Sequence, residues 1–207
     1  MAEQAVRPSS SPETAGGSVP ARRWRTVDIV VTAVLGVAFG VVFWAWDVLW
    51  AAVSGAFTVF PPAQAFMYGV WLLPAVLAPL IVRKPGAGFF AELVAAILSA
   101  LMGSSWGSII LLYGLLQGVA GELGYAVFGW RRFGWPQALL SSVLAGAMAA
   151  ALDLVYYYPS WAAGWKVTYL VVVVASTVVV AGVGGTALVR ALARTGALSS
   201  FAAGRRR

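Results

Sequence analysis

The residues that could do chemistry are the few polar side chains inside long apolar stretches. They include Gln117, Glu92 and Glu122, with Asp47 and Asp153 nearer the ends of such stretches. An acid at the centre of a membrane-spanning helix costs roughly 2.5–3.5 kcal/mol, so each acid needs a partner or a purpose. The chain has no histidine and no cysteine, which excludes zinc–thiolate sites, histidine-ligated haem, cysteine nucleophiles and histidine-based triads. Carboxylates, an amide and aromatic rings remain, and these groups bind ligands.

Spacing along the chain predicts which polar residues lie together. Trp106, Tyr113 and Gln117 are separated by seven and four residues, so they share one face of a helix. Glu122 lies five residues beyond Gln117 and is rotated from it by roughly 140°, so the two share a pocket only if nearby glycines distort the helix. For Glu92 and Glu122 the alternatives are protonation, pairing with each other, or pairing with a cytoplasmic arginine. For Asp153 and Asp47 the alternative is solvation at the membrane interface.

Aromatic residues are concentrated towards one end of the predicted helices. Two interpretations are open: an aromatic belt at the membrane interface, or a lid or cage for a flat or cationic ligand. The residues concerned are Trp44, Trp46, Trp50, Trp106, Tyr156, Tyr157, Tyr158, Trp161 and Trp165.

Composition and apolar runs predict the elements that position these side chains. The chain has 207 residues, of which 61% are hydrophobic and only 10% are charged, which is too apolar for a water-soluble domain. About 20 apolar residues cross the bilayer core as a helix. The sequence therefore predicts an all-α integral membrane protein, a six-transmembrane-helix bundle. The predicted helices are Val27–Leu49, Gln64–Val82, Ala87–Met102, Ser108–Phe128, Pro136–Tyr158 and Val167–Leu192.

The basic residues predict the orientation of this bundle. Lys166 is the single cation in the loops after the first, third and fifth helices. By the positive-inside rule, both termini are cytoplasmic. The net charge of +7 then reports topology and indicates no nucleic-acid partner. The basic residues on the predicted cytoplasmic side are Arg22, Arg23, Arg25, Arg83, Lys84, Arg131, Arg132, Arg190, Arg194 and Arg205 to Arg207.

Composition also divides the chain into three parts. Residues 1–21 are rich in proline, serine and glycine, which predicts a disordered tail. Glu3 and Glu13 fall where a signal peptide would be positive, so none is expected. Residues 22–194 form the predicted membrane domain, and residues 195–207 form a basic cytoplasmic tail.

The first predicted helix has a stripe of small residues at four-residue spacing, Thr32, Gly36 and Gly40. Such a groove lets another helix approach closely. It is interpreted either as a docking surface for a partner protein or as internal packing. The chain contains no phosphate-binding loop of the G-x-x-x-x-G-K-[ST] type, so any ATP-driven work falls to another polypeptide.

Several short strings carry a resemblance to a known family. They are YGVW at 68–71, RKPGA at 83–87 followed by Glu92, and QG at 117–118 followed by Glu122. With six predicted helices, the chain resembles the substrate-binding (S) component of an energy-coupling factor (ECF) transporter. Over roughly residues 24–200 it is similar to the YkoE family of thiamine and hydroxymethylpyrimidine permease subunits.

The resemblance implies uptake of thiamine (vitamin B1) or its hydroxymethylpyrimidine precursor by a subunit that is not an enzyme. It implies a multi-pass protein of the cell membrane, working with a transmembrane coupling protein and two ABC ATPases. No metal or cofactor is expected. Thiamine is a permanent cation with an aminopyrimidine ring, which suits carboxylates, an amide and aromatic faces.

On this interpretation Gln117 and Glu122 bind the polar end of the ligand, and Asp153 and Tyr157 form the outer rim. Glu92 is a further candidate, although its depth suits a structural pair or a docking switch better. The predicted stacking walls are Tyr68, Trp71, Trp106 and Tyr113.

Other functions are weighed beside this one. An S component for another flat vitamin such as riboflavin or biotin would not need a carboxylate for a cation. A non-catalytic structural membrane partner would carry no ligand. A channel is disfavoured because no continuous polar stripe is present. An intramembrane enzyme would rely on aspartate and glutamate alone, and the outer and inner acids lie too far apart in depth for one site.

Overall fold

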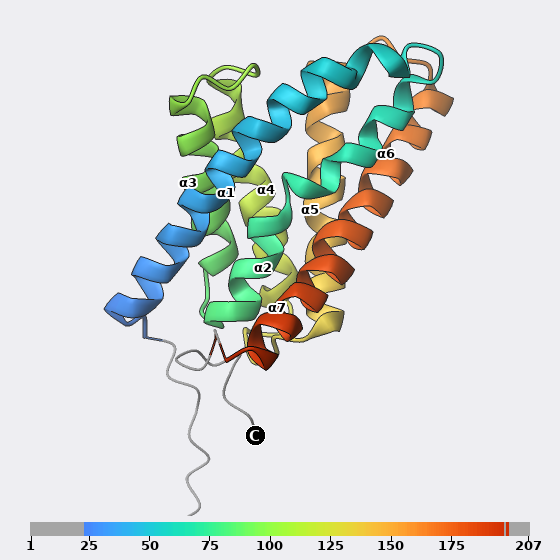
Figure 1. The fold of residues 1–207 in the computed structure, drawn as a ribbon. Coiled ribbons are helices and arrows are strands. Elements are labelled where there is room, and N and C mark those ends of the chain that lie inside the picture. Colours follow the sequence, from blue (N-terminus) through green and yellow to red (C-terminus); the bar gives the residue numbers. More distant parts are fainter. Residues whose placement is uncertain (1–22, 197, 199–207) are drawn as a thin grey trace, which may run out of the picture.

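The structure, a computed structural model, describes residues 23–196 and residue 198. In this part of the chain all regular elements are helical and no strand occurs. The all-α prediction is therefore confirmed (Figure 1). The predicted tail of residues 1–21 lies outside the described residues, as does most of the predicted tail of residues 195–207.

The helices follow the predicted apolar stretches. Five segments are long and apolar enough to cross a membrane, and Ala87–Leu101 is a shorter apolar helix. The elements are α1 (Thr26–Val53), η1 (Ser54–Phe57), η2 (Pro61–Val70), α2 (Leu73–Val82), α3 (Ala87–Leu101), α4 (Ile109–Ala126), α5 (Trp135–Tyr156), α6 (Ala163–Thr177), η3 (Val178–Gly184) and α7 (Gly185–Arg194).

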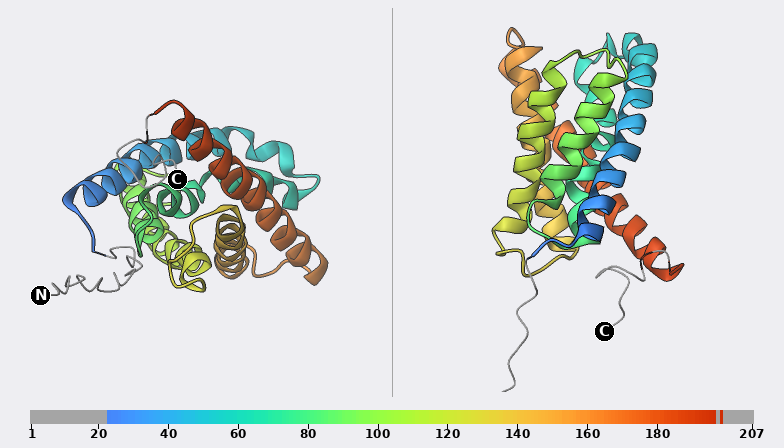
Figure 2. Two further views of the ribbon diagram at one scale, coloured as in Figure 1. Left: turned by 90° about the horizontal axis from the view of Figure 1, so that it is seen from below. Right: turned by 90° about the vertical axis from the view of Figure 1, so that its left-hand side faces the viewer.

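The helices pack around α2. Helix α1 lies along α3, α3 along α4 and α4 along α5, while α6 packs against both α5 and η2. Every residue of α2 from Pro74 to Val82 is buried. Figures 1 and 2 show α1 running obliquely across the bundle, and the continuous α6–η3–α7 helix crossing it on another side. One part of the core is thus the short helix α2 enclosed by its neighbours, and a second part lies between η2, α5 and α6.

The second predicted helix, Gln64–Val82, is not a single α-helix. It consists of the 3-10 helix η2, a turn at residues 71–72, and α2. Pro74 has no N–H with which to continue a helical hydrogen-bond ladder, so the helix breaks before it. Just before the break, the hydroxyl of Ser176 binds two backbone groups of η2: its Oγ accepts the Gly69 N–H at 3.0 Å and donates to the Phe66 carbonyl at 2.7 Å. Backbone groups at membrane depth are thus satisfied by protein.

The small-residue stripe of α1 faces the interior. Thr32, Gly36 and Gly40 are all buried. A Cβ on Gly36 would lie 2.6 Å from the Val94 Cβ, and one on Gly40 would lie 2.6 Å from the Leu98 Cβ. The docking interpretation is therefore wrong for this stripe, whose three residues are all buried: Gly36 and Gly40 let α1 approach α3 of the same chain, which is the internal-packing alternative.

Charge divides the molecule into two ends. We call one the basic end, where α1 begins, the α2–α3 and α4–α5 loops lie, and α7 ends (Figure 1). The other is the pocket end, with η1, the α3–α4 turn and the α5–α6 loop, where Lys166 is the one cation among the described residues. The described basic residues of the basic end are Arg23, Arg25, Arg83, Lys84, Arg131, Arg132, Arg190 and Arg194.

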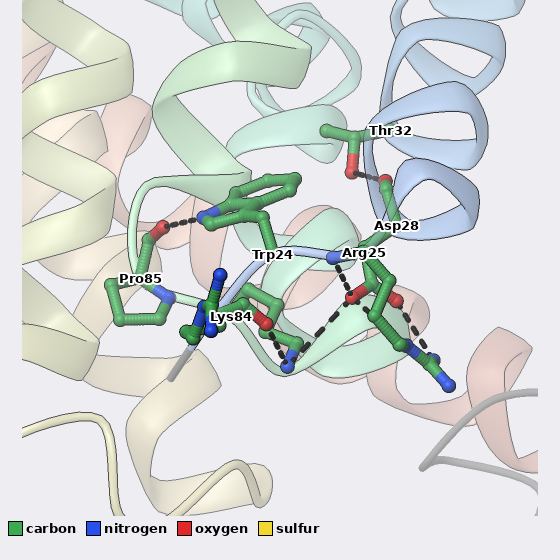
Figure 3. Close-up of polar contacts among 7 residues, drawn as sticks. Trp24, Arg25, Asp28, Thr32, Lys84 and Pro85 are labelled. Atoms are coloured by element: carbon green, nitrogen blue, oxygen red, sulfur yellow. Dashed lines mark hydrogen bonds and ion pairs between the residues drawn. The ribbon is translucent and has the colours of Figure 1, made fainter. Parts of the chain in front are cut away.

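At the basic end, the start of α1 is fastened to the α2–α3 loop (Figure 3). The Trp24 indole donates to the Pro85 carbonyl at 3.1 Å. Asp28 pairs with Arg25 at 2.9 Å, and the Lys84 ammonium lies 3.7 Å from the same carboxylate. The Thr32 hydroxyl donates to the Asp28 carbonyl one turn further along. These contacts join two segments that are about 60 residues apart in sequence.

Candidate binding site

A pocket opens between α1, η2, α3, α4, α5 and α6 at the pocket end. It contains about 670 Å³ of empty space, its open mouth included. Eight of the nine predicted ligand-site residues line it. They are Tyr68, Trp71, Glu92, Trp106, Tyr113, Gln117, Asp153 and Tyr157.

Glu122 is the predicted site residue that does not line the pocket. Helix α4 continues regularly from Ile109 to Ala126, so the rotation of roughly 140° between Gln117 and Glu122 persists. The Glu122 carboxylate instead binds the start of α3 and the indole of Trp130. The Gly86 N–H donates to its Oε1 at 2.7 Å, the Gly88 N–H to its Oε2 at 2.9 Å, and Trp130 Nε1 to its Oε1 at 2.6 Å.

Asp153 is the centre of a tyrosine cluster. Its Oδ1 accepts the hydroxyls of Tyr113 at 2.7 Å and Tyr68 at 3.4 Å, and its Oδ2 accepts the hydroxyl of Tyr169 at 2.5 Å. Only 6% of Asp153 is exposed, so solvation at the membrane interface does not describe it. Hydroxyl donors stabilise a carboxylate without neutralising it. The Asp153 carboxyl group thus accepts three hydroxyl hydrogen bonds and has no lysine or arginine partner among the described residues.

Amides extend this hydrogen-bond network. Gln117 Nε2 donates to the Tyr68 hydroxyl at 3.4 Å, and this hydroxyl in turn donates to Asp153. Nearer the mouth, Gln64 Nε2 donates to the Tyr158 hydroxyl at 2.7 Å. Burial, with a smaller contribution from the negative Asp153, raises the pKa of Tyr158 to about 12. Tyr158 therefore stays a neutral phenol at physiological pH.

Aromatic rings form the walls of the pocket. The Trp106 ring centroid lies 4.7 Å from that of Trp50 and 5.4 Å from that of Tyr157. Tyr68 and Trp71 meet edge to face, with their ring centroids 5.5 Å apart. Such walls present π faces and ring edges to a flat ligand. No lysine or arginine is among the described residues that line the pocket, so its chemistry favours a flat ligand that carries positive charge.

Glu92 lines the pocket and also has a structural partner. Its Oε2 accepts the Ala75 N–H at 3.0 Å, and Ala75 lies in the first turn of α2. The first N–H groups of a helix have no partner within the helix and favour a nearby negative charge. Glu92 therefore completes the start of α2, as Glu122 completes the start of α3. The alternative pairing of these two acids with each other is not observed.

The sequence did not identify Gln64 and Tyr169 as site residues. Tyr169 is 16 residues beyond Asp153, on a different helix, so no helical spacing relates them. Solvation at the membrane interface, one of the interpretations open for Asp47, does not apply, because only 1% of Asp47 is exposed. The tryptophans near Asp47 in the sequence were the one signal that it could be a buried acceptor, since indole N–H groups inside a membrane need hydrogen-bond acceptors.

Fold and site together define a class: a helical membrane protein with one aromatic pocket that holds an unpaired carboxylate. Residues 27–148 match the family described as "ABC-type cobalt transport system, permease component". The chain belongs to this family.

More specific relatives follow from two further comparisons. The chain is 29% identical over 185 residues to the "Putative HMP/thiamine permease protein YkoE" of Bacillus subtilis (strain 168), with 89% of this chain and 92% of that protein covered. It is also similar to a solved structure, "Crystal structure of an S-component of ECF transporter", with a TM-score of 0.83, 28% identity, and coverage of 88% and 92% of the two chains. These matches confirm the resemblance to ECF S components and, within them, to YkoE.

Proposed function

We propose that this protein is the substrate-binding S component of an ECF-type importer and that it takes up thiamine or its hydroxymethylpyrimidine precursor. The observation that carries the ligand class is the Asp153 cluster, a buried carboxylate with three tyrosine donors and, among the described residues that line the pocket, no lysine or arginine. The name of the Bacillus subtilis relative supports the choice of ligand within that class.

The thiazolium of thiamine is the natural partner for the negative charge at Asp153. A charge in a membrane interior is expensive unless it is paired, and a permanent cation supplies the missing pair. The ring walls at Trp106 and Tyr157 add cation–π attraction. Charge attraction and ring contacts are non-covalent, so binding of this kind requires no covalent chemistry. This agrees with a role that is not enzymatic.

The aminopyrimidine ring is assigned to the deeper polar groups. Gln117 offers both a donor and an acceptor, which matches the exocyclic amine and a ring nitrogen. Tyr68 and Trp71 stack beside it, and Glu92 borders the same region. Glu122 has no part in this assignment, because its oxygens are occupied at the basic end.

The remaining assignments concern the assembly. The basic end and both termini are placed in the cytoplasm of the cell by the positive-inside rule, so the pocket opens to the outside. The ATP-driven step is assigned to an ECF transmembrane coupling protein and two ABC ATPases. With Thr32, Gly36 and Gly40 buried, the coupling protein must contact other residues.

Calorimetric titration of the detergent-purified protein with thiamine and with hydroxymethylpyrimidine tests this proposal. Tight binding of at least one is expected, and Gln117→Ala should weaken it at least tenfold. Trp135→Phe is a matched control, because Trp135 is 56% exposed and lies outside the pocket. If neither compound binds tightly while riboflavin or biotin does, the ligand assignment fails. If none of the four binds, the chain is not a vitamin-binding subunit for these compounds.

A further inference from the structure

Asp47 lies behind the pocket wall and has no part in the proposed ligand contacts. It is one of the most buried side chains of α1, with 1% exposed. Its Oδ1 accepts two indole N–H groups, from Trp71 at 2.9 Å and from Trp106 at 3.1 Å. Both tryptophans line the pocket, whereas Asp47 does not.

The second oxygen of Asp47 binds the end of α3 and the turn that follows it. Its Oδ2 accepts the hydroxyl of Ser104 at 2.5 Å and that of Ser99 at 3.5 Å. The Ser104 N–H donates to the Ser99 carbonyl at 3.0 Å, and the Trp106 N–H lies 3.4 Å from the Ser104 Oγ. One carboxylate thus joins α1, the turn before α2, the end of α3 and the α3–α4 turn.

Backbone hydrogen bonds shape the α3–α4 turn, among them Gly103 N–H to the Ala100 carbonyl at 3.1 Å and Gly107 N–H to the Ser104 carbonyl at 3.1 Å. Gly103 and Gly107 adopt positive φ values of 84° and 68°, and a Cβ on either would meet nothing within 4 Å. The turn is therefore open around its two glycines, and Asp47 binds it from the inside. Trp106, which this turn carries, packs on Trp50 and Tyr157 across the pocket.

We propose that Asp47 is a positioning residue for the binding site, holding the indoles of Trp71 and Trp106 in place and thereby slowing ligand release. It acts through the two rings and touches no ligand. The inference rests on the proposed function for the identity of the ligand, but the arrangement of the rings exists without one.

The donor set predicts that geometry, rather than charge, is what Asp47 supplies. An asparagine can turn its carbonyl oxygen towards the two indoles and its amide NH₂ towards Ser99 and Ser104. Indole N–H groups only donate, but serine hydroxyls both donate and accept, so all four contacts survive. Alanine at position 47 leaves both indoles without an acceptor.

The experiment measures the dissociation rate of thiamine, and of hydroxymethylpyrimidine, from purified Asp47→Ala and Asp47→Asn by stopped-flow tryptophan fluorescence. Asp47→Ala should release ligand at least tenfold faster, and Asp47→Asn should stay within about threefold of the unmodified protein. Trp46→Phe is the control. Trp46 precedes Asp47 in the chain but does not line the pocket, and its indole donates a hydrogen bond of 2.9 Å to the Met67 carbonyl that the substitution removes. Its rate should not change.

Near-ultraviolet circular dichroism of the ligand-free proteins gives a second reading. The tryptophan bands should change in Asp47→Ala and persist in Asp47→Asn. An unchanged release rate or unchanged bands in Asp47→Ala would overturn the inference, as would an Asp47→Asn protein that behaves like Asp47→Ala. If the unmodified protein binds neither compound, the proposed function fails, and the dichroism still decides the role of Asp47.

Discussion

Two pairs of buried acids satisfy their carboxylates in different ways. Asp47 and Asp153, at the pocket end, accept hydrogen bonds only from side chains: indoles, serines and tyrosines. Glu92 and Glu122, towards the basic end, accept from backbone N–H groups at the starts of α2 and α3, and Glu122 also accepts the Trp130 indole N–H.

This difference in donors separates a part of the molecule whose hydrogen bonds can rearrange around a ligand from a part whose hydrogen bonds cannot. A hydroxyl rotates and can reverse its hydrogen bond, whereas a backbone N–H only donates and moves only with its helix. The tyrosines around Asp153 can therefore turn towards a ligand. Glu92 and Glu122 fix the positions of helices α2 and α3 from which the pocket is built.

The largest expected effect is at the rigid end. Gly88→Ala would place a Cβ 2.3 Å from the Ala75 carbonyl, so α2 and α3 must separate. We expect a loss of about 3 kcal/mol or more in the free energy of unfolding. Size-exclusion chromatography of detergent extracts should show little folded protein. Gly55→Ala is the control, because its Cβ meets nothing within 4 Å. Equal yields from the two variants would contradict a rigid α2–α3 contact.

The next effect concerns charge at the adaptable end. Asp153→Asn keeps acceptors and donors for the tyrosine hydroxyls but removes the negative charge. Affinity for cationic thiamine should fall about 30-fold, the lower end of the cost of breaking a buried charge pair. Affinity for neutral hydroxymethylpyrimidine should change less than about threefold. Calorimetry measures both, and an equal loss for the two ligands would show that charge is not what Asp153 contributes.

A neutral replacement should behave differently at the rigid end. Glu122→Gln presents an NH₂ group to a backbone or indole donor that cannot reverse, so a buried donor stays unpaired. We expect a loss of about 1–2 kcal/mol in stability, measured as a lower Tm in detergent. The folded fraction should bind ligand with unchanged affinity. An unchanged Tm would remove the distinction between backbone and side-chain donors.

The smallest effect comes from a single hydroxyl. Tyr113→Phe removes one of the three donors to Asp153 and keeps the ring that lines the pocket. A neutral hydrogen bond contributes about 0.5–1.5 kcal/mol, so affinity should change about threefold, with Tm nearly constant. A loss as large as that of Asp153→Asn would mean that the tyrosine itself, rather than the carboxylate, carries recognition.

The sequence predicted the helical segments well because membrane crossing imposes a minimum length on apolar runs. It could not predict the break at residues 71–72 in detail, since the side chains that bind the backbone on either side of it, Ser176 on η2 and Glu92 on α2, come from elsewhere in the chain. Pro74 can be read from the sequence, but whether it breaks the helix depends on whether other side chains can bind the backbone groups that the break leaves unpaired.

The pocket was predictable only where its residues lie on one helix. Helical spacing relates Trp106, Tyr113 and Gln117 within one segment, and all three line the pocket. No spacing relates Tyr169 to Asp153 or Asp47 to Trp106, because those contacts depend on how helices rotate against one another. Glu122 was assigned with Gln117 on the condition of a distorted helix, and α4 is regular.

Helix α1 connects the two ends in a way that follows from its length. At 28 residues it is a rod of about 42 Å. Asp28, near one end, is bound by the α2–α3 loop, and Asp47, near the other, is bound by the pocket wall. A single helix therefore links the pocket wall, through Asp47, to Lys84 in the α2–α3 loop on the far side of the molecule.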